Sequence, residues 1–169
     1  MARIRSELES GLSPVEVVKR LVSAYESCGR NYVTGLAARI PMTDGRSKKS
    51  GQIRFQNVDR SAKAMIEVLD VDPMRAISTG EAEFATKMSS RRHVYEHNAG
   101  VADQKYLEES GDDTATVGQA IRETSRNAVR LGPLLLAMMS NIDAGFRSIF
   151  PPEETAAGLK RWAQASPAR

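Results

Sequence analysis

The longest regular pattern in the sequence is a set of apolar residues that recur at helical spacing toward its C-terminal end. The set comprises Val117, Ala120, Ile121, Ala128, Leu131, Leu135, Met138, Ile142, Phe146 and Ile149. Because this spacing places the side chains on one face of a helix, it predicts a long helix that buries that face. Gly132 and Pro133 predict a kink within it, since the proline ring blocks one backbone hydrogen bond and clashes one turn back.

The N-terminal part carries a clear signal for the start of a helix. Ser13 can cap a helix, and Pro14 suits the first helical position. Apolar residues follow at helical spacing, so we expect a first helix that runs to about Cys28. Gly29 and its polar neighbours predict a break there, and residues 32–40 predict a second, shorter helix.

Two more helices are expected in the middle of the chain. Apolar residues from Phe55 to Leu69 recur with a strong helical period and predict a core helix that ends before Pro73. Residues 79–98 predict the next helix, capped by Ser78 or Thr79 and stopped by the Asn-Ala-Gly sequence at its end. Residues 101–110 show no clear pattern.

The remaining segments are polar or short, and no stretch alternates as a strand does. Residues 1–12 are charged and predict a flexible N-terminal arm. Residues 43–51 predict a mobile basic loop, because they are polar and include glycine. The fold class is therefore all-α: a single-domain bundle of four or five helices over residues 13–151, followed by a short helical segment and tail over residues 152–169.

Length and composition fit one globular domain. The chain has 169 residues, of which 41% are hydrophobic, and a formal net charge of +3. This charge is compatible with a nucleic acid partner but far from a histone-like excess. Cys28 has no second cysteine to pair with, and no apolar run resembles a signal peptide or a membrane span. We therefore expect a cytoplasmic protein without a membrane partner.

Most of the residues suited to chemistry lie between Ser89 and Tyr106. This stretch contains both histidines of the chain, His93 and His97, four residues apart. On a helix they share a face roughly opposite an apolar stripe of Phe84, Met88 and Tyr95, which would pack on the core. The histidines would then face solvent, a substrate or a second chain.

Two interpretations of this stretch need no nucleic acid. The sequence His93-Val94-Tyr95-Glu96-His97 matches H-x-x-E-H, a pattern in which two histidines bind zinc and the glutamate activates water. The sequence contains no third histidine for such a site, so we expect no metal cofactor. The second interpretation is an exposed basic helix face, on which Arg92 and Glu96 form an ordinary surface ion pair.

A third interpretation rests on a resemblance. Arg92, followed after four intervening positions by His97, resembles the R-x(4–6)-H signature of HEPN (higher eukaryotes and prokaryotes nucleotide-binding) domains. The continuation Asn98-Ala99-Gly100, then Asp103 and Lys105-Tyr106-Leu107, resembles a run found in several bacterial members. His93 stands where the family usually has Asn or Asp. Arg91 also satisfies the spacing, but it falls near the apolar stripe, so Arg92 is the better candidate.

The resemblance implies a metal-independent endoribonuclease that acts at a dimer interface. Arg92, His97 and His93 would be catalytic, and Glu96, Asn98 and Arg91 would support them. An imidazole can move the 2′-hydroxyl or 5′-oxygen proton, and an arginine can hold the phosphate. The resemblance also implies a homodimer and, for toxin or defence ribonucleases, an antitoxin or other protein partner. Some members are non-catalytic binding proteins, which is the main alternative.

The polar segment at residues 43–51 adds candidate RNA contacts. Arg46, Lys48 and Lys49 carry positive charge that can attract a phosphate backbone. The simpler alternative is that these side chains only keep the surface solvated.

Overall fold

The computed structural model describes residues 2–149 and is all-helical there, as the sequence predicts. Its helices are α1 (Ala2–Glu9), α2 (Pro14–Ala37), α3 (Asp44–Gly51), α4 (Val58–Leu69), α5 (Thr79–His97), α6 (Gln104–Ser110) and α7 (Ser125–Ile149). Seven helices in the described part exceed the four or five expected. The predicted tail helix at residues 152–169 lies outside the described residues. No helix within residues 2–149 combines the length and apolarity that a bilayer crossing requires.

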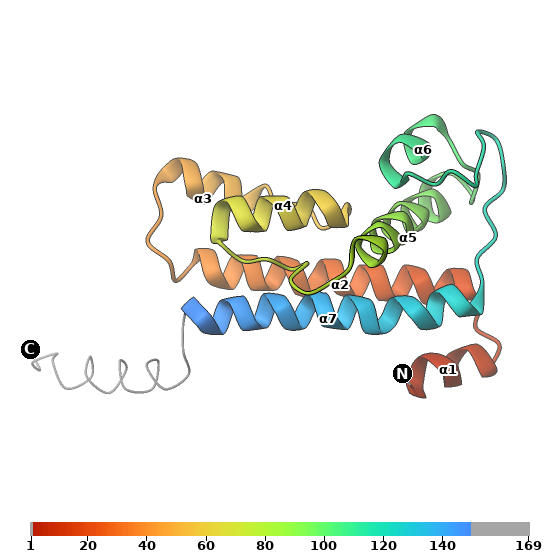
Figure 1. The fold of residues 1–169 in the computed structure, drawn as a ribbon, viewed down its shortest axis with the longest axis horizontal. Coiled ribbons are helices and arrows are strands. Elements are labelled where there is room, and N and C mark those ends of the chain that lie inside the picture. Colours follow the sequence, from red (N-terminus) through yellow and green to blue (C-terminus); the bar gives the residue numbers. More distant parts are fainter. Residues whose placement is uncertain (1, 150–169) are drawn as a thin grey trace, which may run out of the picture.

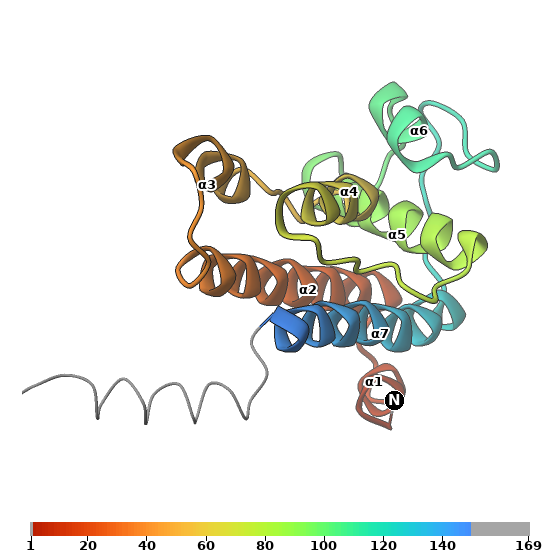
Figure 2. The ribbon, with the colours of Figure 1, turned by 60° about the vertical axis from the view of Figure 1, so that its left-hand side comes forward.

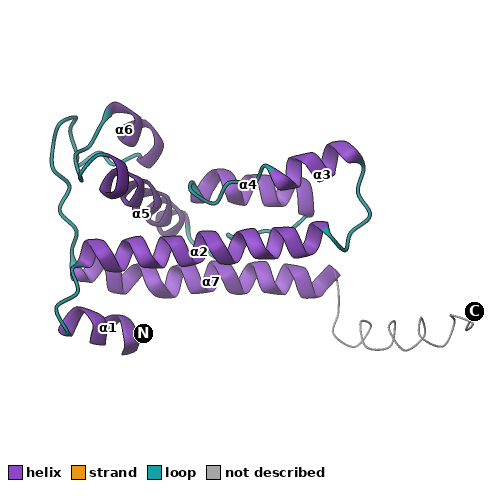
Figure 3. Ribbon diagram, turned by 180° about the vertical axis from the view of Figure 1, so that it is seen from behind, coloured by secondary structure: helices purple, strands orange, loops and turns teal. Residues whose placement is uncertain are grey.

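The two longest helices, α2 and α7, form the base of the fold. They lie side by side and run in the same direction, as their colours in Figure 1 show. Helix α1 packs against α7 on one side of this pair, and α3 to α6 lie on the other side (Figure 3). Figure 2 shows α3 and α6 at opposite ends of the layer that α3 to α6 form. The fold therefore places α5 and α6 together, away from α3.

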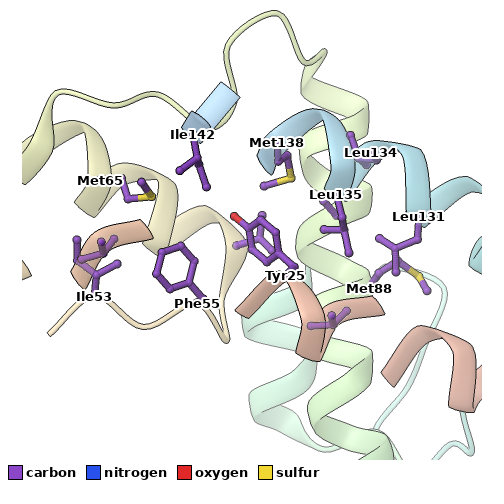
Figure 4. Close-up of a cluster of buried hydrophobic side chains, with 14 of the residues drawn as sticks. Tyr25, Ile53, Phe55, Met65, Met88, Leu131, Leu134, Leu135, Met138 and Ile142 are labelled. Carbon is purple, nitrogen blue, oxygen red and sulfur yellow. The ribbon is translucent and has the colours of Figure 1, made fainter. Parts of the chain in front are cut away.

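The main core fills the space between the α2–α7 pair and helices α4 and α5. Tyr25 of α2 and Phe55, from the segment before α4, meet edge to face with ring centroids 5.9 Å apart. Figure 4 shows the Tyr25 ring beside Met138 of α7, and all these side chains belong to one core cluster that also includes Met65 of α4. This burial of apolar surface is the main stabilising contribution to the fold.

Helix α2 passes through Gly29, where the sequence predicted a break, so that prediction was wrong. Its predicted start is confirmed, because the Ser13 side chain accepts a hydrogen bond from the Glu16 amide at 3.2 Å. Gly29 is buried against Phe55, and a Cβ atom added there would lie 2.4 Å from the Phe55 ring. The glycine therefore serves the close approach of a neighbouring segment and does not end the helix.

A matched pair of substitutions in α2 tests this role of Gly29. We expect Gly29→Ala to lower the free energy of unfolding, because overpacking costs about 1–3 kcal/mol and exceeds the ~1 kcal/mol that alanine gains over glycine in a helix. Gly35→Ala should raise the free energy of unfolding by up to about 1 kcal/mol, since nothing lies within 4 Å of a Cβ added at Gly35. Urea denaturation of both variants would measure the two signs, and equal effects would contradict the packing argument.

Two polar segments expected to be irregular are helices instead. Residues 2–9 of the predicted arm form α1, in which Ile4 and Leu8 pack against the main core. Residues 44–51 of the predicted loop form α3, whose first turn is capped by the Thr43 side chain. Both helices are short and polar, and for that reason neither shows a marked apolar period.

The long C-terminal helix begins later than predicted. Residues 117–124 are not helical, because their backbone bonds to the turn after α5: Gly118 N donates to Ala102 O at 2.8 Å, and Ile121 N donates to Gly100 O at 2.8 Å. The apolar residues in this segment continue the helical period by coincidence. Helix α7 contains Pro133, and the kink expected there stays a prediction.

Candidate functional site

The C-terminal half of α5 carries the candidate site, and α6 folds back against it. Asn98 ends the helix, and Ala99 and Gly100 turn the chain with positive φ values of 51° and 80°. Val94 is buried in a small cluster with Ala102 and Tyr106, which attaches α6 to α5. Of the predicted apolar stripe, Met88 is fully buried, whereas Phe84 and Tyr95 are partly buried.

The two histidines lie next to each other on α5. Their ring centroids are 4.6 Å apart, and the side chain of His97 is 59% exposed. His93 is half-buried, and its pKa is lowered by burial and then by the nearby charges of His97 and Lys105. A lowered pKa favours the neutral imidazole of His93, which is the form that can accept a proton.

Arg92 faces α2, and only 13% of its side chain is exposed. Its Nη2 donates to Oε2 of Glu26 at 3.4 Å. Its Nε lies 3.2 Å from Oε2 of Glu96, which is an ion-pair distance without the alignment of a hydrogen bond. The same Glu96 oxygen lies 4.0 Å from Nε2 of His97. Glu96 therefore connects Arg92 to the histidine pair, but Arg92 is less open to a substrate than expected.

Glu26 is the member of this cluster that the sequence interpretation missed. It is buried, and burial raises its pKa. Its Oε1 has no hydrogen-bond partner within the described residues. A signal was present, because Glu26 falls on the same helix face as the buried Val22, Gly29 and Val33. A carboxylate on a buried face needs a charged partner, although the sequence does not say which one.

Arg91, a predicted supporting residue, belongs to a separate and buried network. Its guanidinium donates to Asp112 at 2.9 Å and to Glu123 at 3.4 Å. The Tyr106 hydroxyl also donates to Asp112, at 2.5 Å, and the Tyr95 hydroxyl donates to Glu123, at 3.2 Å. These contacts hold residues 112–123 against α5 and α6, so Arg91 supports the fold of this region.

Asn98 also has a role in the local fold. Its side-chain amide donates to Asp103 at 2.5 Å, and Asp103 in turn caps α6 by accepting from the Tyr106 amide at 2.7 Å. The HEPN-like run after His97 therefore builds the turn between α5 and α6 and places Lys105 on the first turn of α6.

The three basic residues predicted to bind RNA lie on α3, apart from the histidines. The Nε of Arg46 donates to the Val68 carbonyl at 2.5 Å, and Lys49 pairs with Glu67 at 2.8 Å. Lys48 is exposed. Lys49 is thus paired with a carboxylate, and Arg46 is engaged in a hydrogen bond that holds α3 to α4.

A cleft of about 420 Å³ opens beside His93, between α4, α5, α6 and the segment before α4. Its lining residues are Gln52, Ile53, Arg54, Gln56, Asn57, Arg60, Ala64, Ser90, His93, Lys105 and Glu109. A larger cleft, of about 840 Å³, follows the N-terminal half of α5 and includes neither histidine. The smaller cleft is the one that adjoins the candidate chemistry, and the sequence interpretation identified none of its basic residues as a ligand contact.

The H-x-x-E-H pattern does not form a metal site in the described part of the chain. No group of three or more His, Cys, Asp and Glu side chains there is arranged to hold a metal ion. Comparisons of the chain with protein-family models, with curated proteins and with solved structures find no match.

Proposed function

We propose that the protein is a metal-independent endoribonuclease of the HEPN type. The observation that carries the proposal is the histidine pair, with ring centroids 4.6 Å apart and Arg92 beside it on the same helix. Two imidazoles at this separation can act as base and acid in one reaction, and Arg92 and His97 have the R-x(4–6)-H spacing.

In the proposed reaction, the RNA supplies its own nucleophile. His93, whose pKa is lowered, accepts the proton of a 2′-hydroxyl as the 2′-oxygen attacks the adjacent phosphorus. The bond between phosphorus and the 5′-oxygen breaks, and His97 donates a proton to that oxygen. The products are a 2′,3′-cyclic phosphate and a 5′-hydroxyl. Arg92 stabilises the charge that develops on the phosphate oxygens.

The ion-pair contacts of Arg92 are compatible with this role but weaken its attraction for a phosphate. Glu26 and Glu96 both lie within ion-pair distance of the guanidinium and offset its charge. Burial raises the pKa of Glu26, while the Arg92 charge acts on that pKa in the opposite direction. The same two contacts favour the second candidate function, a non-catalytic HEPN-like protein in which Arg92 and Glu26 join α2 to α5.

RNA cleavage by the purified protein separates these two functions. We expect cleavage of single-stranded RNA to products with 2′,3′-cyclic phosphate and 5′-hydroxyl ends, at a rate that EDTA leaves unchanged. The ends can be identified by mass spectrometry and by their response to polynucleotide kinase. A 2′-O-methyl RNA is the control, because it lacks the nucleophile. If varied RNAs all stay intact, the non-catalytic binding protein becomes the better proposal. If a chelator removes bound zinc and the activity is lost with it, a zinc hydrolase is favoured.

We also propose that the active form is a homodimer through the face that bears His93 and His97. His97 is exposed on an open surface, so a substrate held there needs a second wall. Val101, just beyond the end of α5, is a large apolar residue that is exposed as well. In a two-fold dimer, each chain would contribute the same groups to one cleft. Sedimentation should show a dimer at micromolar concentration, and a monomer would count against both the dimer and the catalytic proposal.

A toxin or defence role beside an antitoxin would follow from a ribonuclease of this type. Expression of the wild-type protein in a bacterial host should then slow growth.

A further inference from the structure

The cleft beside His93 has a feature that the proposed chemistry does not use: its charge. Three basic side chains line it, Arg54, Arg60 and Lys105, against one carboxylate, Glu109. Arg60 lies 3.6 Å from Glu109 and shares that charge. Arg54 donates only to the Gly51 carbonyl, at 3.2 Å, and Lys105 forms no ion pair with another described residue. Two positive charges therefore remain without a counter-ion in the described structure, which favours an anionic ligand.

The uncharged polar residues of the cleft indicate a ligand that also has hydrogen-bonding groups. The side-chain amides of Gln52 and Gln56 have no hydrogen-bond partner within residues 2–149. The Ser90 hydroxyl has none there either, and Ser90 is only 7% exposed. A carboxamide can donate and accept at once, as the edge of a nucleobase requires. Cations and free carboxamides in one cleft match a phosphate and a base.

The size of the cleft restricts the ligand further. A volume of about 420 Å³ falls in the range of small-molecule sites, and it suits one nucleotide better than a duplex. Ile53 and Ala64 add apolar residues to the lining of the cleft. His93 is the member shared with the proposed catalytic pair, so a nucleotide in the cleft would lie directly next to the reacting bond.

We propose that this cleft binds one nucleotide of single-stranded RNA next to the bond that is cut, with its phosphate at Arg54 and Lys105 and its base at Gln52 and Gln56. The inference rests on the proposed function for the identity of the strand. It assigns substrate positioning to residues 52–60 and to α6, in place of the basic residues of α3. The cleft would hold the strand so that a 2′-hydroxyl reaches His93.

The test is binding of a single-stranded 2′-O-methyl RNA hexamer, which cannot be cleaved, measured by fluorescence anisotropy. We expect Arg54→Ala and Lys105→Ala each to weaken binding about tenfold, as loss of a charge-assisted phosphate contact does. Each should also reduce the slope of log affinity against log salt concentration by about one, which corresponds to one counter-ion fewer released on binding. Arg5→Ala is the matched control, because Arg5 is exposed on α1, on the other side of the α2–α7 pair (Figure 1). It should bind as the wild type does.

A second variant tests the part of the proposal that concerns the base. Gln52→Ala should change the order of affinity among the four 2′-O-methyl homohexamers more than it changes the mean affinity. A uniform loss, or no change, would remove the base from the proposal. Circular dichroism and thermal denaturation would show that each variant is folded, and Gln52, Arg54 and Lys105 all lie at the surface of the cleft.

The outcomes separate this inference from the proposed function. If the wild-type protein does not bind the hexamer, or if Arg5→Ala weakens binding as much as Arg54→Ala, the cleft is not the site. Equal affinity for a hexaglutamate peptide would mean attraction to any anion and would also overturn it. If the wild type cleaves RNA while Arg54→Ala and Lys105→Ala bind normally, only the cleft proposal fails. If the variants lose binding but no RNA is cut, the cleft stands and catalysis falls.

Discussion

His97→Ala should lower the rate of RNA cleavage by a factor of about 10² to 10⁴, the usual contribution of a positioned acid or base. In the proposed reaction His97 donates the proton that the departing 5′-oxygen needs, so its loss acts on the chemical step. Affinity for RNA should barely change, because phosphate attraction comes from several basic groups. Single-turnover cleavage of a labelled RNA, with the protein in excess, would measure the chemical step apart from binding.

The structure predicts that His97→Ala leaves the stability of the fold unchanged, whereas Arg92→Ala lowers it. The His97 side chain is 59% exposed, so its removal should leave the melting temperature close to that of the wild type. Arg92 is only 13% exposed, and its removal would leave Glu26 buried without its partner. Unchanged cleavage by a folded His97→Ala variant would contradict the catalytic assignment.

A double substitution controls for the structural part of the Arg92 effect. Arg92→Ala combined with Glu26→Gln removes the guanidinium and the buried charge together, so the protein should be more stable than with Arg92→Ala alone. If cleavage stays low while stability returns, Arg92 contributes to the reaction itself. If cleavage returns as well, Arg92 acts only through the fold, and the non-catalytic function gains support.

The parts of the fold that the sequence predicted well are those with local signals at both ends. Helix α5 was expected over residues 79–98 and extends over Thr79–His97, and Ala99 and Gly100 reverse the chain after it. Ser78 stands at the N-cap position, as expected, but its side chain makes no capping hydrogen bond. Helix α3 was missed, since its eight residues are polar and its cap, Thr43, looks like an ordinary loop residue. The predicted break at Gly29 was wrong, because the glycine allows close packing against Phe55, which is 26 positions away in the chain.

In the candidate site too, local spacing predicted some of the residues, and tertiary packing brings in the others. The adjacency of His93 and His97 follows from a spacing of four on a helix, and the structure places their rings together. The choice of Arg92 over Arg91 followed from the position of Arg91 near the apolar stripe, and it stays a prediction. In the structure Arg91 lies in a buried network, and Arg92 is equally little exposed. Glu26 and the cleft residues come from other elements of the chain. Only tertiary packing brings them to α5, and no local pattern in a single sequence encodes that packing.

The buried network around Arg91 should make Asp112 one of the most sensitive positions in the described structure. The Asp112 side chain is fully buried and accepts from Arg91, Tyr106, Thr114 and Lys87. Asp112→Ala would leave the mostly buried Arg91 charge with Glu123, at 3.4 Å, as its remaining ion-pair partner among the described residues. Removing one partner of a buried ion pair costs about 3–5 kcal/mol, so we expect a loss of that order in the free energy of unfolding. Chemical denaturation would measure it.

The control for this prediction is the next residue, and the pH dependence gives a second test. Asp113→Ala removes the same charge from an exposed position and should change stability by less than about 0.5 kcal/mol. Burial alone would raise the pKa of Asp112, but hydrogen bonds from Thr114, Tyr106, Arg91 and Lys87 lower it well below its usual value. A carboxyl with a depressed folded pKa stabilises the protein above its unfolded pKa of about 3.9, and that contribution is lost as the pH falls through the folded pKa. The stability gap between wild type and Asp112→Ala should therefore be full at pH 7 and shrink below about pH 4. A gap that is the same at pH 7 and pH 3 would show that the Asp112 charge does not stabilise the fold.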